Sequence, residues 1–142
     1  MKQKTVSGKC LCGAVEIEAK LAKEAMGACH CRMCRQWGGG PMLTVDCGQD
    51  VSIKGENNVG RFESSEWAVR GFCSKCGTHL FYQINANGQM FVPAGFFNEA
   101  DDLHFDHQIF IDQKPDNYSF ANDTHNMTGE EAFAAFTPQE SE

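Results

Sequence analysis

The sequence predicts a mainly β fold of short strands that is stabilised by bound metal. Short segments rich in β-branched and aromatic residues recur along the chain between glycine-rich turns, as in β sandwiches and barrels. Seven of the eight cysteines fall into three tight clusters, which is metal-ligand spacing. With 142 residues and a hydrophobic fraction of 42%, we expect one domain over residues 1–142.

The strands are expected in a regular succession. Residues 14–19 alternate apolar and acidic side chains, which is typical of a strand with one face in water. The further candidate strands are residues 41–45, 51–54, 68–72, 79–84, 90–94 and 108–111.

The one clear helix signal lies near the C-terminus. Thr128 and Glu131 form a capping box that predicts the start of a short helix, and Pro138 marks its end. Phe133 and Phe136 share a face of this helix, so we expect them to dock it on a sheet.

Charge and composition exclude several classes of function. The 12 basic and 19 acidic residues give a formal net charge of −7, which argues against a nucleic-acid partner. No segment has the apolar length of a membrane span, and residues 1–8 lack the character of a signal peptide. We therefore expect a cytoplasmic protein with reduced thiols, in which clustered cysteines indicate metal binding or catalysis.

The first and third clusters together supply four thiolates, the ligand count of a closed structural zinc site. Cys10 and Cys12 precede the first expected strand, and Cys73 and Cys76 lie between two later ones. A zinc ion that joins these two turns would fasten distant parts of the chain, which is a structural role.

The middle cluster supplies only three ligands. In an extended segment Cys29 and Cys31 project to one face, and a following turn can bring Cys34 beside them. Three ligands leave one coordination position open, as in catalytic zinc sites. Three thiolates also weaken zinc as a Lewis acid toward carbonyls, so the cluster favours the activation of an incoming thiol.

Other arrangements of the same residues are open at this point. Cys47 could complete a second closed four-sulfur site, and a disulfide within the middle cluster is disfavoured in the cytoplasm. His30 lies between two ligands, so alternation predicts a position behind them or at the surface. His79 is expected to be a strand residue and not a zinc ligand.

The cysteine motifs resemble those of the glutathione-dependent formaldehyde-activating enzyme family, which includes centromere protein V. The resemblance rests on residues 8–15, 29–35 and 70–80, and extends weakly through residues 108–115. Gln108 stands where many relatives have a histidine, and Asn117 and Tyr118 stand where a tryptophan is often found.

The resemblance implies a β-tent fold of small antiparallel sheets and two zinc ions. The structural zinc would be held by Cys10, Cys12, Cys73 and Cys76, and the catalytic zinc by Cys29, Cys31 and Cys34. It further implies a carbon–sulfur lyase activity that joins glutathione and formaldehyde, with Cys31 as the ligand that releases the metal when the thiol binds. Arg32, Arg35 and Arg70 are candidates to bind carboxylates of the ligand.

Three functions therefore compete. The leading hypothesis is a zinc-dependent enzyme that adds a small thiol, such as glutathione, to an aldehyde such as formaldehyde. The second is a non-enzymatic, zinc-stabilised binding module. The third is a thiol redox enzyme of the methionine sulfoxide reductase type, for which Cys47 is the available nucleophile.

Overall fold

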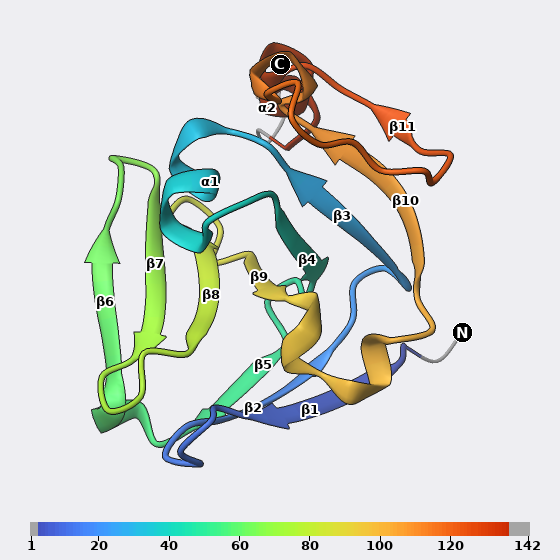
Figure 1. Ribbon diagram of the computed structural model, residues 1–142. Coiled ribbons are helices and arrows are strands. Elements are labelled where there is room, and N and C mark those ends of the chain that lie inside the picture. Colours follow the sequence, from blue (N-terminus) through green and yellow to red (C-terminus); the bar gives the residue numbers. More distant parts are fainter. Residues whose placement is uncertain (1–2, 137–142) are drawn as a thin grey trace, which may run out of the picture. The chain divides into compact units, whose positions relative to one another are not determined.

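The computed structural model describes residues 3–136 and has a mainly β fold, as predicted (Figure 1). Within these residues the chain forms eleven strands, two short α-helices and four 3-10 helices. It divides into two compact units, Met1–Met26 with Thr44–His104 and Gly27–Leu43 with Phe105–Glu142. In residues 3–136, every helix is too short or too polar to cross a membrane.

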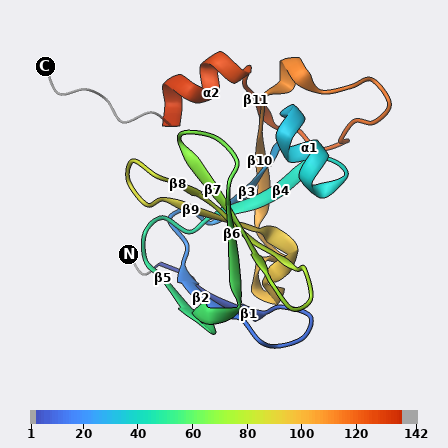
Figure 2. The same ribbon diagram turned by 90° about the vertical axis from the view of Figure 1, so that its left-hand side faces the viewer.

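The first unit contains a three-stranded antiparallel sheet, in the order β1-β2-β5 (Figure 2). Its inward-facing side chains, among them Val6 and Ile17, are fully buried, whereas alternate residues face outward, as a sheet with one wet face requires. The strands are β1 (Thr5–Lys9), β2 (Glu16–Lys20) and β5 (Val51–Lys54).

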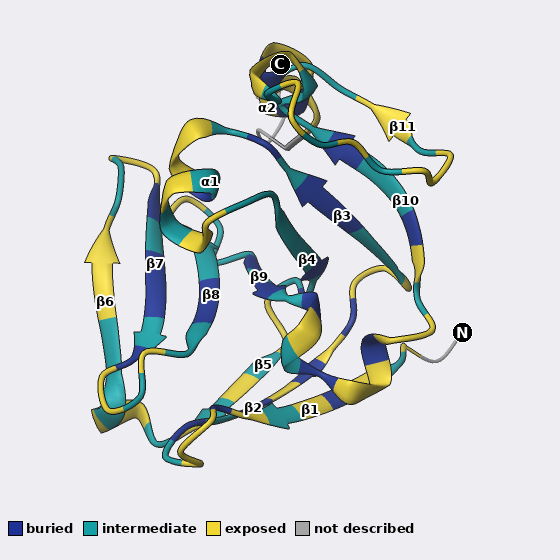
Figure 3. Ribbon diagram, in the orientation of Figure 1, coloured by how far each residue is buried: buried dark blue, intermediate teal, exposed yellow. Residues whose placement is uncertain are grey.

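The same unit contains a run of antiparallel strands in the order β4-β9-β8-β7-β6. Leu80 and Phe81 of β8 are fully buried, and the ring of Phe81 fills the space beside Gly71, where a Cβ would lie 2.3 Å from it. The edge strand β6 is exposed over its second half (Figure 3). The bounds are β4 (Met42–Asp46), β6 (Val59–Glu63), β7 (Ala68–Cys73), β8 (His79–Ile84) and β9 (Met90–Pro93).

In the second unit the strands follow the order β11-β10-β3, and the β10–β11 pair is parallel. The helix α1 follows β3 after two residues and is capped at its C-terminus by Gly39, whose φ of 87° is the left-handed conformation that glycine tolerates. The elements are β3 (Ala25–Cys29), α1 (Arg32–Gly38), β10 (His104–Ile109), β11 (His125–Asn126) and α2 (Gly129–Phe136).

Two details of β10 and α1 differ from the predictions. The strand expected at residues 108–111 is displaced, because β10 ends at Ile109 and Phe110 takes a left-handed conformation with φ 55°. Helix α1 was not predicted at all.

The capping box of α2 is confirmed. The Thr128 hydroxyl accepts a hydrogen bond from the Glu131 amide at 3.1 Å, and the Glu131 carboxylate accepts one from the Thr128 amide at 2.8 Å. The predicted stop at Pro138 lies outside the described residues, as does the side chain of Phe136.

The described side chains of α2 pack through Ala132 and Phe133. Ala132 is buried, whereas Phe133 is 49% exposed and meets the ring of Phe110 edge to face at 5.8 Å. The same Phe110 ring covers Gly129, where a Cβ would lie 2.5 Å from it. Phe110 therefore contacts the helix at Phe133 and Gly129, and the expected contribution of Phe136 stays a prediction.

Candidate functional site

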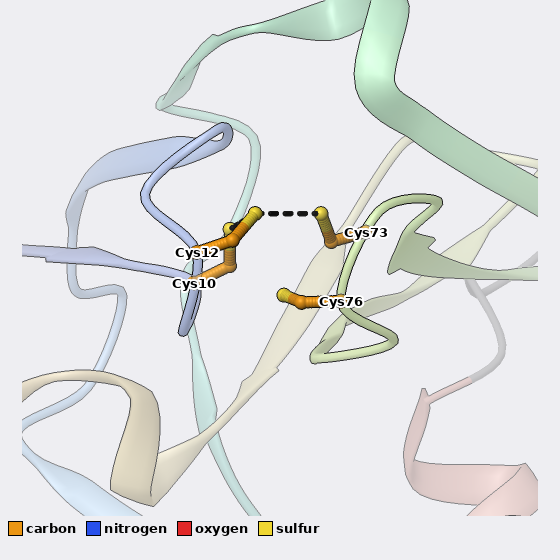
Figure 4. A group of neighbouring side chains, drawn as sticks. All are labelled: Cys10, Cys12, Cys73 and Cys76. Carbon is orange, nitrogen blue, oxygen red and sulfur yellow. Dashed lines mark hydrogen bonds between the residues drawn. The ribbon is translucent and has the colours of Figure 1, made fainter.

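The first unit brings together the four cysteines of the predicted closed site. Cys10 and Cys12 project from the turn after β1, and they face Cys73 at the end of β7 and Cys76 in the turn that follows it (Figure 4). The sulfur of Cys12 lies 3.7 Å from the sulfurs of both Cys10 and Cys73. Sulfurs at about 2.3 Å from one tetrahedral zinc ion are roughly 3.8 Å apart, so this donor set fits zinc.

Hydrogen bonds favour the thiolates of two members of this group, Cys10 and Cys76. The Val15 amide donates a hydrogen bond to the sulfur of Cys10 at 3.3 Å. Burial raises the pKa of the Cys10 thiol, but the hydrogen bonds to its sulfur lower the pKa by more, so the pKa lies below its ordinary value. The Thr78 hydroxyl lies 3.1 Å from the sulfur of Cys76, and this bond together with the Thr78 amide lowers the pKa of Cys76 to about 5. Metal ligands must be deprotonated, so these contacts prepare the site for a cation.

The second unit brings together the three cysteines of the middle cluster. Their sulfurs lie within 4.8 Å of one another. Cys29 ends β3, Cys31 is the N-cap of α1, and Cys34 lies in the first turn of that helix. The sulfur of Cys31 accepts a hydrogen bond from the Cys34 amide at 3.3 Å, so the helix begins on a cysteine instead of the usual serine or aspartate.

The electrostatics of this group also fit a cation. Hydrogen bonds with Cys31 and Cys34, burial and the charges of both neighbours together raise the pKa of Cys29 far above its ordinary value. Three neighbouring thiols cannot all ionise unless a positive charge compensates them, and a divalent cation supplies that charge. Within residues 3–136, no histidine, carboxylate or further cysteine joins the group.

Cys47 belongs to neither cysteine group. It lies in the first unit, fully buried, with its sulfur 3.9 Å from the carbonyl oxygen of Val45. Burial raises the pKa of its thiol to about 12. A buried, protonated thiol is a poor nucleophile, so the structure disfavours the redox hypothesis that depended on Cys47.

His30 is turned away from the cysteine sulfurs, and both of its ring nitrogens have other partners. Nδ1 lies 2.8 Å from the hydroxyl of Tyr118, and Nε2 lies 2.7 Å from Oε1 of Gln108. The side chain is fully buried, and this burial lowers its pKa. Of the two positions expected for His30, the one behind the ligands is confirmed.

A pocket of about 570 Å³ lies beside α1 in the second unit. Arg32 and Arg35 of the helix contribute positive charge, and Tyr118 and Phe120 contribute aromatic surface. Its other walls are formed by Gly39, Gly40, Pro41, Pro115, Asn117 and Ser119. The volume is typical of small-molecule sites, and the two arginines suit an anionic ligand.

The two arginines of α1 are held differently. The Nε of Arg35 donates a hydrogen bond to the carbonyl oxygen of His30 at 2.9 Å, whereas the exposed Arg32 is fixed through its backbone amide by Oε1 of Gln113 at 2.9 Å. Arg70 belongs to the first unit, where it is 5% exposed, bonds the Ser64 hydroxyl at 3.2 Å and lies over the Tyr82 ring. Binding of a ligand by Arg70 stays a prediction.

Sequence reasoning missed the loop of residues 115–120 and its contact with His30. Gln108 and Tyr118 were singled out only because many relatives differ there. The structure gives them a shared role, because both bond the same buried imidazole. No local pattern reports this contact, since the bonded residues are 78 and 88 positions apart.

A mainly β fold with one four-cysteine and one three-cysteine group defines a class of small β proteins whose clustered cysteines are spaced to hold metal ions. Comparison with known proteins is more specific. Residues 5–113 match the family model described as glutathione-dependent formaldehyde-activating enzyme. The chain is also 38% identical over 125 residues to an uncharacterized lyase of Schizosaccharomyces pombe, covering 87% of this chain and 91% of that protein. The chain therefore belongs to the glutathione-dependent formaldehyde-activating enzyme family.

A solved structure supports the fold. A Rhodobacter sphaeroides protein matches with a TM-score of 0.57 at 24% sequence identity, over 70% of this chain and 98% of that one.

Proposed function

We propose that this protein is a zinc-dependent carbon–sulfur lyase that catalyses the reversible addition of a small thiol to an aldehyde. Glutathione and formaldehyde are the proposed pair, in keeping with the family. The proposal depends on one observation: a three-cysteine group without a fourth described ligand surrounds the start of α1, the helix whose two arginines line a pocket.

The two cysteine groups have different proposed roles. Zinc held by Cys10, Cys12, Cys73 and Cys76 would be structural. Zinc held by Cys29, Cys31 and Cys34 would supply an open electropositive position that lowers the pKa of a thiol.

The protein's own residues would bind and orient the ligand. Arg32 and Arg35 are proposed to bind its carboxylates, because a guanidinium offers a fork of donors that matches a carboxylate. Cys31 is the proposed catalytic cysteine. The Cys34 amide donates a hydrogen bond to the sulfur of Cys31 at 3.3 Å. This hydrogen bond would stabilise the negative charge of the Cys31 sulfur if that sulfur left the metal.

The proposed reaction conserves atoms and electrons without an oxidant. The thiol sulfur forms a bond to the aldehyde carbon, the π electrons of the carbonyl move to its oxygen, and the thiol proton ends on that oxygen. The lyase direction reverses each of these changes.

The experiment measures exchange between formaldehyde, glutathione and S-(hydroxymethyl)glutathione by NMR. We expect the zinc-loaded protein to accelerate the exchange, and Cys31→Ser to abolish the acceleration while circular dichroism stays unchanged. Arg35→Lys is expected to raise KM for glutathione by about tenfold with kcat maintained, because one bidentate contact is lost.

X-ray absorption at zinc separates the enzyme from the binding module. Two zinc ions that each have four sulfur ligands from the protein, and that do not change when glutathione is added, would reject the enzyme proposal. The non-enzymatic binding module would then be the better description.

A further inference from the structure

The outer strand β6 has one open side. Its five residues, Val59–Glu63, pair with β7 on one side, and within residues 3–136 no strand lies on the other side (Figure 1). Such an edge presents amide and carbonyl groups that can form a ladder with a further strand. Arg61, Phe62 and Glu63 are all exposed, so the described chain leaves this half of the strand uncovered (Figure 3).

The other edge strands of the described chain suit such a ladder less well. Strand β11 has only two residues. In β1 the amide of Ser7 already donates a hydrogen bond to the carboxylate of Glu99 at 3.3 Å. Strand β5 carries a single charged residue, Lys54, so two copies of it would offer each other no opposite charge. The strand β6 is therefore the edge to consider.

The sequence of β6 complements itself about Phe62. Successive side chains of a strand point to opposite faces, so Arg61 and Glu63 share one face and Phe62 lies on the other. When two antiparallel copies pair with Phe62 opposite Phe62, Arg61 of each copy lies opposite Glu63 of the other. Centring the pair on Arg61 or on Glu63 would instead oppose like charges. The charges therefore favour one register.

The charged groups of β6 are available for these pairs. Nη2 of Arg61 lies 3.0 Å from Oε1 of Glu56, but both side chains are exposed, and such ion pairs contribute little in water. The guanidinium has five N–H donors, so it can bind a second carboxylate and keep Glu56. Its central carbon lies 5.5 Å from the centre of the Phe81 ring. No described cation lies within ion-pair distance of Glu63.

We propose that this protein forms a symmetric dimer in which the β6 strands of two copies pair antiparallel about Phe62. The side chain of Phe62 is 64% exposed, and the pairing places it beside Phe62 of the second copy, where an aromatic pair stabilises a sheet. The ladder involves five residues of each chain, so the interface is smaller than that of a standard stable complex. The dimer consequently dissociates on dilution. This inference does not depend on the proposed function.

Sedimentation velocity of the zinc-loaded protein measures the association. We expect a reversible monomer–dimer equilibrium between about 10 µM and about 1 mM, with the dimer predominant at the upper end. Amide hydrogen exchange in residues 59–63 should slow over the same range, because open backbone groups of β6 become hydrogen-bonded. A monomer at every concentration would overturn the proposal, as would a dimer in which exchange of these amides is unchanged.

Charge reversal tests the register. Arg61→Glu opposes two carboxylates at both symmetric positions, and Glu63→Arg opposes two guanidinium groups, so each variant should raise Kd at least about tenfold. The double variant that carries both changes has opposite charges again, and its Kd should return to within about threefold of wild type. Glu66→Arg makes the same charge change as Glu63→Arg in the loop after β6, and should leave Kd within about threefold of wild type.

The variants change only exposed side chains, and circular dichroism checks the fold of each one. Loss of the dimer in both single variants and its return in the double variant would support the pairing. A dimer that either single variant leaves intact, or that the double variant does not restore, would overturn it, because the two copies would then meet through another surface or in another register.

Discussion

Replacing Cys73 by serine tests the structural role of the four-cysteine site. A zinc ion in this site links Cys12 to Cys73, which are 61 positions apart. By the loop-entropy relation for covalent cross-links, closing a loop of that length stabilises the folded state by about 4 kcal/mol. The span from Cys29 to Cys34 is far shorter, and the same relation gives about 2 kcal/mol.

The expected result follows from these magnitudes. For a chain of this size about 4 kcal/mol corresponds to a fall in Tm of roughly 13 °C. The fall would be larger if the metal–ligand energy, about 10 kcal/mol or more in small zinc domains, is lost as well. The assay is thermal unfolding followed by far-ultraviolet circular dichroism, with zinc content measured on the same samples.

Cys47→Ala is the matched control, because Cys47 is also fully buried but belongs to neither cysteine group. It should cost about 1 kcal/mol and leave the zinc content unchanged. The reasoning would be refuted if Cys73→Ser lost one zinc ion per chain yet melted no lower than Cys47→Ala.

Three further predictions concern single residues. Cys31→Ser should lower Tm by clearly less than Cys73→Ser and abolish the thiol–aldehyde exchange; an equal loss of stability in both variants would contradict the division of roles. Burial raises the pKa of Cys47 from 9.0 to about 12, so the protonated thiol stabilises the fold fully below pH 9 and less as the pH rises toward 12. Between pH 8 and pH 10.5, the free energy of unfolding measured in urea should therefore fall less for Cys47→Ala than for wild type. Thr128→Ala should cost about 1 kcal/mol and speed amide exchange in the first turn of α2; unchanged exchange would mean that the capping box does not hold the helix.

The strands that could be predicted are those whose own residues carry the pattern. The strands at residues 51–54 and 79–84 have the predicted bounds, because their side chains suit a strand without reference to distant contacts. Strand β3 was missed because its middle residue is Gly27, a weak strand former. A Cβ at Gly27 would lie 2.1 Å from the ring of His107, so that glycine reflects a contact 80 positions away.

The candidate site likewise has residues that could be predicted from the sequence and residues that could not. Both cysteine groups could be predicted because ligand spacing is a local property of the sequence, and the structure brings each group together. Helix α1 could not be predicted, because it has only seven residues and its N-cap is the sulfur of Cys31 instead of a usual capping side chain. The hydrogen-bond partners of His30 could not be predicted either, because Gln108 lies on β10 and Tyr118 lies on a loop, and only the folded unit places them beside the imidazole.

The left-handed Phe110 has a consequence for how the sequence can diverge. A side chain in this conformation costs about 1 to 2 kcal/mol, and here its ring covers Gly129. Positions 110 and 129 are therefore coupled: a side chain at 129 becomes acceptable only after the ring at 110 is lost. Glycine at 110 would relieve the backbone and make that room, but it would also remove the surface on which Phe133 rests. Homologues should consequently change the two positions together, with compensation at 133.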